Sequence, residues 1–93
     1  MKVFQTRLFA GKVKKISAQE KAILDGEIRK IIANPSIGQE KRGTLKGVFV
    51  HKLKIHTTQF LLAYRFSDPQ ILELIMIGPH ENYYRDLDNY LKE

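Results

Sequence analysis

The sequence has 93 residues, a size that fits one domain, and 43% of them are hydrophobic, as in ordinary globular proteins. This composition argues against disorder, and the absence of cysteine excludes a disulfide framework and a cysteine-based zinc site. Sixteen Lys and Arg against ten Asp and Glu give a formal charge of +6, which favours polyanionic or acidic partners, although such charge can also serve solubility alone.

The start of the chain gives no sign of export. Residues 1–7 lack the apolar core of a signal peptide, and no apolar run approaches the length of a transmembrane helix. Together with the absence of cysteine, this predicts a cytoplasmic protein whose residues 1–93 form one domain.

A short strand and two helices are predicted in the first third of the chain. Residues 3–5 suit a strand, and apolar residues then recur at helical spacing over residues 8–16. Ser17 and Glu20 have the spacing of a capping box, which predicts that a second helix begins there. That helix ends before Pro35, because the residue before a proline is pushed out of the helical region. The two helices should form a hairpin.

The rest of the chain predicts strands. Residues 36–47 contain glycines and a basic cluster, which indicates a loop without a core element. Three segments rich in β-branched, aromatic and leucine residues predict strands: 48–55, 59–66 and 71–77. Their short connections require antiparallel hairpins. In the terminal stretch, Leu87, Tyr90 and Leu91 predict one apolar face of a short helix.

The expected fold is therefore α+β. An N-terminal strand and a helical hairpin should pack on one face of a mainly antiparallel sheet, with a short C-terminal helix. The other face of the sheet should be open. If basic strand residues line it, that face is a plausible place to hold a nucleic-acid strand.

Lys52 and Lys54 are the first candidates for such a face. They alternate with Leu53 and Ile55, so both ammonium groups should share one surface of the strand. Fixed positive charge of this kind stabilises the negative charge that accumulates on a phosphate under attack. The alternative is a solvated strand face whose lysines protect against aggregation.

His80 is the candidate for proton transfer. It follows a strand end and a Gly-Pro turn, which predicts an imidazole exposed at the rim of the sheet. Histidine titrates near neutral pH, so it can protonate a leaving 5′-oxygen or accept the proton of an attacking 2′-hydroxyl. The alternative is a surface histidine without a chemical role.

Tyr84 lies four positions after His80 and would project from the same side if the segment were helical. There it can stack on a base or assist proton transfer. One of Tyr83 and Tyr84 is expected to anchor the core instead. Arg85 can hold a phosphate or pair with a neighbouring carboxylate.

Other chemistries lack support in the sequence. Tyr84 stands where a zinc-protease motif beginning at His80-Glu81 would need its second histidine. Asp86 and Asp88 are too isolated for a two-metal nuclease site. No glycine-rich loop follows a strand and opens a helix, as a nucleotide cradle would. We therefore expect neither a metal nor a nucleotide cofactor.

Four segments, in this order, carry a family resemblance. They are IIANPSIG at residues 31–38, GTLKGVFVHKLK at 43–54, LAYR at 62–65 and GPHENYYRDL at 78–87. Together they resemble the RelE/ParE superfamily of bacterial toxin-antitoxin toxins over almost the whole chain. The resemblance implies a compact toxin with a RelE-like fold, neutralised by a small antitoxin.

Two branches of this superfamily differ in activity. RelE members cleave messenger RNA on the ribosome without a metal, whereas ParE members poison DNA gyrase and lack the cleavage residues. The positions of Lys52 and Lys54 match strand lysines of RelE, and Gly78-Pro79-His80 with Tyr84 resembles the carboxy-terminal site of YafQ-type nucleases. Both matches favour cleavage.

One position departs from the RelE pattern, because Leu61 stands where RelE has an active-site arginine. The resemblance therefore leaves the stabilising charge to come from Arg65 or Arg85. The sequence predicts catalytic roles for His80, Lys52, Lys54 and Tyr84, and RNA or phosphate contacts for Arg85, Arg65, Lys46 and Arg42. The alternatives are a gyrase inhibitor of the ParE type and a protein that binds its antitoxin without poisoning anything.

Overall fold

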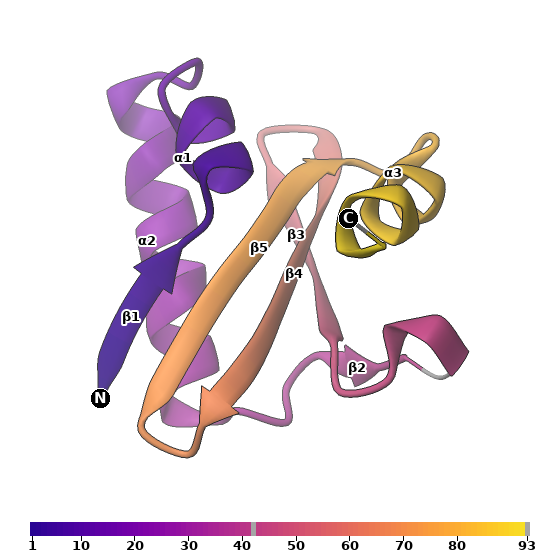
Figure 1. The fold of residues 1–93 in the computed structure, drawn as a ribbon. Coiled ribbons are helices and arrows are strands. Elements are labelled where there is room, and N and C mark those ends of the chain that lie inside the picture. Colours follow the sequence, from indigo (N-terminus) through magenta and orange to yellow (C-terminus); the bar gives the residue numbers. More distant parts are fainter. Residues whose placement is uncertain (42, 93) are drawn as a thin grey trace.

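The computed structural model describes residues 1–41 and 43–92 (Figure 1). Within them, one sheet has the strand order β1-β5-β4-β3-β2. The elements, in chain order, are β1 (Lys2–Gln5), α1 (Arg7–Val13), α2 (Ala18–Ala33), β2 (Gln39–Glu40), a 3-10 turn (Gly43–Leu45), β3 (Phe49–Ile55), β4 (Thr58–Asp68), β5 (Ile71–Pro79) and α3 (Tyr83–Leu91). β1 runs parallel to β5, and the other neighbours are antiparallel. The predicted α+β fold is confirmed.

Side-chain caps set where the first two helices begin. Thr6 caps α1: its hydroxyl accepts from the backbone N–H of Phe9 at 3.0 Å and donates to the carbonyl of Ile75 at 2.6 Å. Ser17 and Glu20 form the predicted capping box at the start of α2. These bonds satisfy backbone donors that the first helical turn leaves without partners. The cap at Thr6 also ties α1 to the sheet.

The sheet has a hydrophobic core on each face. The helical hairpin covers one face, where Phe9, Leu24 and Ile31 pack against strand residues such as Leu62 and Tyr64. Helix α3 lies on the opposite side of the sheet, as Figure 1 shows. A second set of buried residues forms the core between α3 and the sheet. That set is Val48, Val50, Leu61, Ala63, Ile75, Met76, Tyr83 and Leu87.

Two expectations about the fold were wrong. The second face is not left open, because α3 covers part of it with the buried side chains of Tyr83 and Leu87. The segment 36–47 is not only loop: it contains β2, which pairs with β3 through Gln39 and Glu40. A two-residue strand leaves too short an alternation to be recognised in a sequence. Both corrections bear on the site, since β2 pairs with the start of β3 and α3 lies on the face of the sheet to which Lys52 and Lys54 point.

Tyr64 fixes the connection between the hairpin and the sheet. Its buried hydroxyl donates to the carbonyl of Pro35 at 2.7 Å and accepts from the backbone N–H of Gly38 at 3.0 Å. Burial raises the pKa of Tyr64, so the hydroxyl keeps its proton. The tyrosine thereby holds the segment that leads into β2.

No helix in the described part of the chain is long and apolar enough to cross a membrane.

Candidate nucleic-acid interface

Lys52 and Lys54 lie on the face of the sheet that carries α3. Both are exposed, whereas Leu53 and Ile55 are buried under the helical hairpin. The strand alternation therefore places the two ammonium groups as predicted. No ion pair involves either lysine among the residues that the structure describes, so their charge is available to a ligand.

The segment after β5 turns sharply into α3. Asn82 has a φ of 59°, a left-handed conformation that asparagine adopts more readily than most residues. Within this turn the backbone N–H of Tyr83 donates to the carbonyl of His80 at 3.2 Å. The turn leaves His80 exposed at the rim, outside the helix that begins at Tyr83.

The two neighbouring tyrosines have different environments. Tyr83 is buried and donates its hydroxyl to the carbonyl of Met76 at 2.7 Å, and burial raises its pKa. Tyr83 is therefore the core anchor. Tyr84 is only partly buried, and its ring lies 6.2 Å from that of His80, at 82° to it. The structure thus brings together His80 and Tyr84, through the turn at Asn82 rather than through a shared helix.

Lys41 joins this pair from the other side of the interface. Its Nζ lies 4.8 Å from the centroid of the Tyr84 ring and 3.1 Å from Oε1 of Gln39. The sequence contains Lys41 within a basic cluster, but no motif singled it out. It lies just after β2, and that strand was not predicted. Its backbone N–H donates to the carbonyl of Val48 at 2.8 Å, which fixes its place beside β3.

The strand register relates the lysines of β3 to the His80 segment. Lys52 pairs with Leu61 on β4, and Leu61 pairs with Gly78 on β5. Since adjacent strands lie about 4.8 Å apart, the Cα atoms of Lys52 and Gly78 are separated by about 10 Å. His80 comes two residues after Gly78. All of these residues therefore lie at one end of the sheet, and no ion pair or hydrogen bond joins Lys52 or Lys54 to His80 among the described residues.

Arg65 and Arg85, the candidates to replace the charge that Leu61 lacks, are both paired with a carboxylate. Leu61 is 0% exposed and packs in the core beneath α3, so this position cannot present a charge to a ligand. Arg65 lies on the same face but is 2.6 Å from the carboxylate of Glu73. Arg85 is exposed and lies 3.5 Å from the carboxylate of Asp86.

The remaining predicted contacts lie beyond β2. Lys46 is exposed and, with Glu40, Lys41 and Gly43, lines a small polar hollow of about 290 Å³. Arg42 lies outside the described residues. Lys46 therefore extends the basic surface that Lys41 begins.

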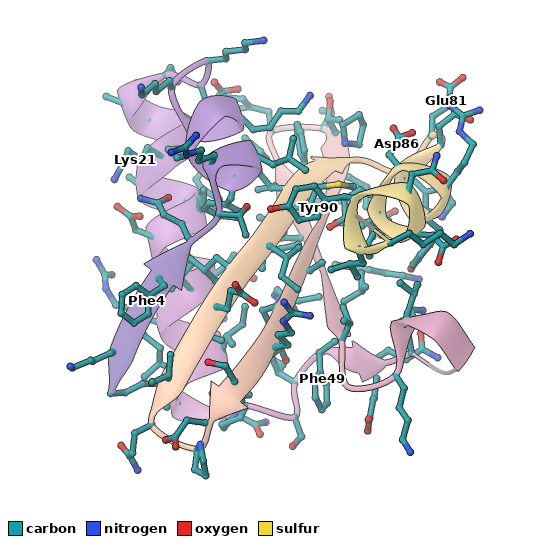
Figure 2. All side chains as sticks on the ribbon, viewed as in Figure 1. Phe4, Lys21, Phe49, Glu81, Asp86 and Tyr90 are labelled. Carbon is teal, nitrogen blue, oxygen red and sulfur yellow. The ribbon has the colours of Figure 1, made fainter. Side chains whose placement is uncertain are left out.

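The opposite side of α3 has another character. A hollow of about 480 Å³ lies between α1 and α3, and Glu81, Asp86 and Tyr90 are among the residues that line it. Figure 2 shows Glu81 and Asp86 on the outer side of the turn and of α3, and Tyr90 pointing back across β5. Lys12 also lines this hollow, but the two carboxylates outnumber it, so the hollow attracts a phosphate less than the exposed lysines of β3 do. The described residues hold no cluster of three or more His, Asp or Glu that could bind a metal ion.

Solved structures and a family model resemble this chain. It superposes on a chain of the intact E. coli RelBE toxin-antitoxin complex with a TM-score of 0.67 and 16% identity, over 86% of this chain and 96% of that one. For the isolated E. coli RelE toxin the TM-score is 0.65 and the identity 15%, over 96% and 97% of the two chains. The predicted RelE-like fold is thereby confirmed. No curated protein sequence gave a match. The model of the ParE-like toxin of type II bacterial toxin-antitoxin systems matches residues 3–88, and the chain belongs to this family.

Proposed function

We propose that this toxin is a messenger-RNA endonuclease that acts on the ribosome, in the cytoplasm, without a metal ion. The observation that supports it best is the contact between His80 and Tyr84 on an exposed rim, next to the face that carries the lysines of β3. Proton transfer, base stacking and charge stabilisation are the three tasks of such a reaction. These side chains supply one group for each task.

In the proposed reaction, the substrate's own 2′-oxygen forms a bond to the adjacent phosphorus. The bond between phosphorus and the 5′-oxygen breaks, which leaves a 2′,3′-cyclic phosphate and a 5′-hydroxyl. His80 gives a proton to the leaving oxygen or takes one from the attacking hydroxyl. Lys52 and Lys54 stabilise the charge on the phosphate, and Tyr84 stacks on a base or assists proton transfer.

The basic residues around this centre would guide the RNA backbone. We assign Arg85, Arg65, Lys46 and Arg42 to phosphate contacts. Arg65 and Arg85 must exchange their carboxylate partners for phosphate when RNA binds, because both are paired in the free protein. The Arg85–Asp86 pair is exposed and therefore weak, so its exchange costs little. The Arg65–Glu73 pair is partly buried and its atoms lie 2.6 Å apart, so its exchange costs more.

Replacement of His80 tests this function. We expect His80→Asn to lower the rate of messenger-RNA cleavage on the ribosome about a hundredfold or more, because a general acid or base is lost. His56→Asn is the matched control: His56 is also exposed and has a φ of 58°, which asparagine tolerates. The measurement is 5′-end mapping of cellular transcripts after induction of each protein. Undiminished cleavage by His80→Asn would exclude the assignment.

A gyrase inhibitor of the ParE type is the second candidate. Two observations favour it: the matching family model is that of ParE-like toxins, and Leu61 is buried where RelE-type cleavage uses an arginine. A supercoiling assay with purified gyrase separates the two functions. Inhibition of supercoiling by a protein that cleaves no RNA on ribosomes would favour this candidate over the nuclease.

We further propose that a cognate antitoxin neutralises the protein by covering the face of the sheet that carries Lys52 and Lys54. The E. coli relative of known structure is found in a complex with its antitoxin. The exposed cations Lys52, Lys54 and Arg85 suit an acidic or amphipathic segment. Charge reversal at these three positions should weaken the complex at least tenfold. Unchanged affinity would place the antitoxin elsewhere on the toxin.

A further inference from the structure

Lys41 lies across the aromatic ring that the proposed function assigns to a base. Its ammonium is 4.8 Å from the centroid of Tyr84, within the range of a cation–π contact. Tyr84 also packs against the core beneath α3, and its ring forms T-shaped contacts with the rings of Tyr83 and His80. Tyr84 therefore does not present two free faces to solvent. A base that stacks on it competes with the ammonium of Lys41 for the same ring.

The side chain of Lys41 can leave the ring while its backbone stays in place. The backbone is held by its hydrogen bond to the carbonyl of Val48 and by a β-bridge to the backbone of Lys46. The ammonium, in contrast, is held by the ring of Tyr84 and the side-chain oxygen of Gln39, and the residue is only partly buried. A contact between an ammonium and a partly exposed ring such as that of Tyr84 is weaker than the stacking of a base on that ring. The base should win the competition.

The displaced ammonium would still lie beside the RNA. A nucleotide whose base stacks on Tyr84 carries its phosphate within the reach of a lysine side chain that starts at the same ring. The charge is also needed there, because Leu61 is buried and both Arg65 and Arg85 are paired. Lys41 is the cation in direct contact with the His80 and Tyr84 pair among the described residues.

We propose that Lys41 is a further RNA-binding residue of this site: it rests on Tyr84 in the free protein and is displaced onto a phosphate by the base that stacks there. The proposal rests on the proposed RNA-cleaving function. It makes the contacts to base and backbone interdependent, since Lys41 reaches the phosphate only when the base holds the ring.

A double-mutant cycle on programmed ribosomes tests this coupling. We expect Lys41→Gln to slow single-turnover messenger-RNA cleavage about tenfold, the scale of one charged hydrogen bond. In a Tyr84→Leu background the same change should slow cleavage by less than about threefold, because the base no longer positions the phosphate. Lys41→Arg should retain most of the activity. Lys14→Gln, which removes one exposed charge from the end of α1, should change the rate by less than about twofold.

A spectroscopic measurement on the free toxin checks the resting state without RNA. The ε-methylene protons of Lys41 should show an upfield ring-current shift in the wild type and lose it in Tyr84→Leu. Unshifted protons in the wild type would overturn the resting contact. Circular dichroism spectra of the variants exclude misfolding as the cause of a lost shift or rate.

The outcomes separate this inference from the function on which it rests. If the wild type cleaves RNA normally and the effects of Lys41→Gln and Tyr84→Leu on the cleavage rate simply multiply in the double variant, the coupling is overturned. The nuclease function then stands. A wild-type protein that cleaves no RNA on ribosomes would overturn both.

Discussion

Gly38 shows how a single residue can be fixed by its neighbours. A Cβ atom at this position would lie 2.8 Å from the hydroxyl oxygen of Tyr64 and 3.1 Å from the carbonyl oxygen of Val50. Neither atom can move freely, because the hydroxyl of Tyr64 donates a hydrogen bond to Pro35 and the carbonyl of Val50 belongs to strand β3. The close approach of backbone to tyrosine therefore requires glycine.

Alanine at two glycine positions should have opposite effects on stability. We expect Gly38→Ala to lower the free energy of unfolding by about 1–3 kcal/mol, because the added methyl group overlaps its neighbours. Gly26→Ala should raise it by about 0.5–1 kcal/mol, because Gly26 lies within α2 and a Cβ there meets nothing within 4 Å. Urea denaturation measures both changes. A Gly38→Ala protein as stable as the wild type would show that the segment into β2 adapts.

The residues of the site differ in how far the sequence could reveal them. Alternation predicts the shared face of Lys52 and Lys54 because it is a property of one strand. The pairing of His80 and Tyr84 was anticipated from helical spacing, although a turn produces it. Lys41 was missed, because its partner lies on α3, far away in the sequence. Contacts between distant segments leave no local pattern.

At the scale of elements, a polar cluster joins the helical hairpin to the sheet. Oε1 of Glu27 on α2 lies 2.8 Å from Nε2 of the buried His51 on β3, and Lys30 donates to its other oxygen at 2.8 Å. Partial burial acts to raise the pKa of Glu27, but the hydrogen bonds from Lys30 and His51 outweigh it and hold the pKa below its ordinary value. The ionised carboxylate is therefore the form that stabilises the fold.

The sign of this shift predicts a dependence on pH. A lowered pKa contributes stability above the ordinary pKa of glutamate, and that contribution is lost as the pH falls below about 4. Glu27→Gln should lower the free energy of unfolding by about 1 kcal/mol at pH 7, and the difference should vanish near pH 3. Asp25→Asn is the control, since Asp25 forms an exposed pair with Lys21 and no other ion pair among the described residues. The measurement is urea denaturation at both pH values; a deficit that persists at low pH would contradict an origin in the ionised carboxylate.

Across the whole molecule, core residues lie on both faces of the sheet, but the exposed positive charge is not evenly placed. The helical hairpin covers one face of the sheet and α3 covers part of the other, so both faces contribute to the core. The formal charge of +6 is spread over the chain, but the exposed lysines of β3 concentrate part of it on the face of the sheet that carries α3. Local placement should therefore matter more for ligand binding than the total.

Two charge reversals of equal size test this point. Lys52→Glu and Lys14→Glu each remove one positive and add one negative charge, so each changes the formal charge of +6 by two units. We expect Lys52→Glu to slow association with programmed ribosomes about tenfold or more and Lys14→Glu to slow it less than about threefold. Stopped-flow association at two ionic strengths measures the rates. Equal effects of the two variants would mean that only the total charge attracts the ligand.

The sequence alone determined the α+β class, the capping box of α2, the antiparallel strands and the family, because each depends on local spacing or on short motifs in order. The tertiary structure decided that β1 joins β5 in parallel, that α3 covers Leu61, and that Lys41 reaches Tyr84. These features depend on which distant segments pack together. Packing is set by the burial of whole faces, and no single stretch of the sequence records it.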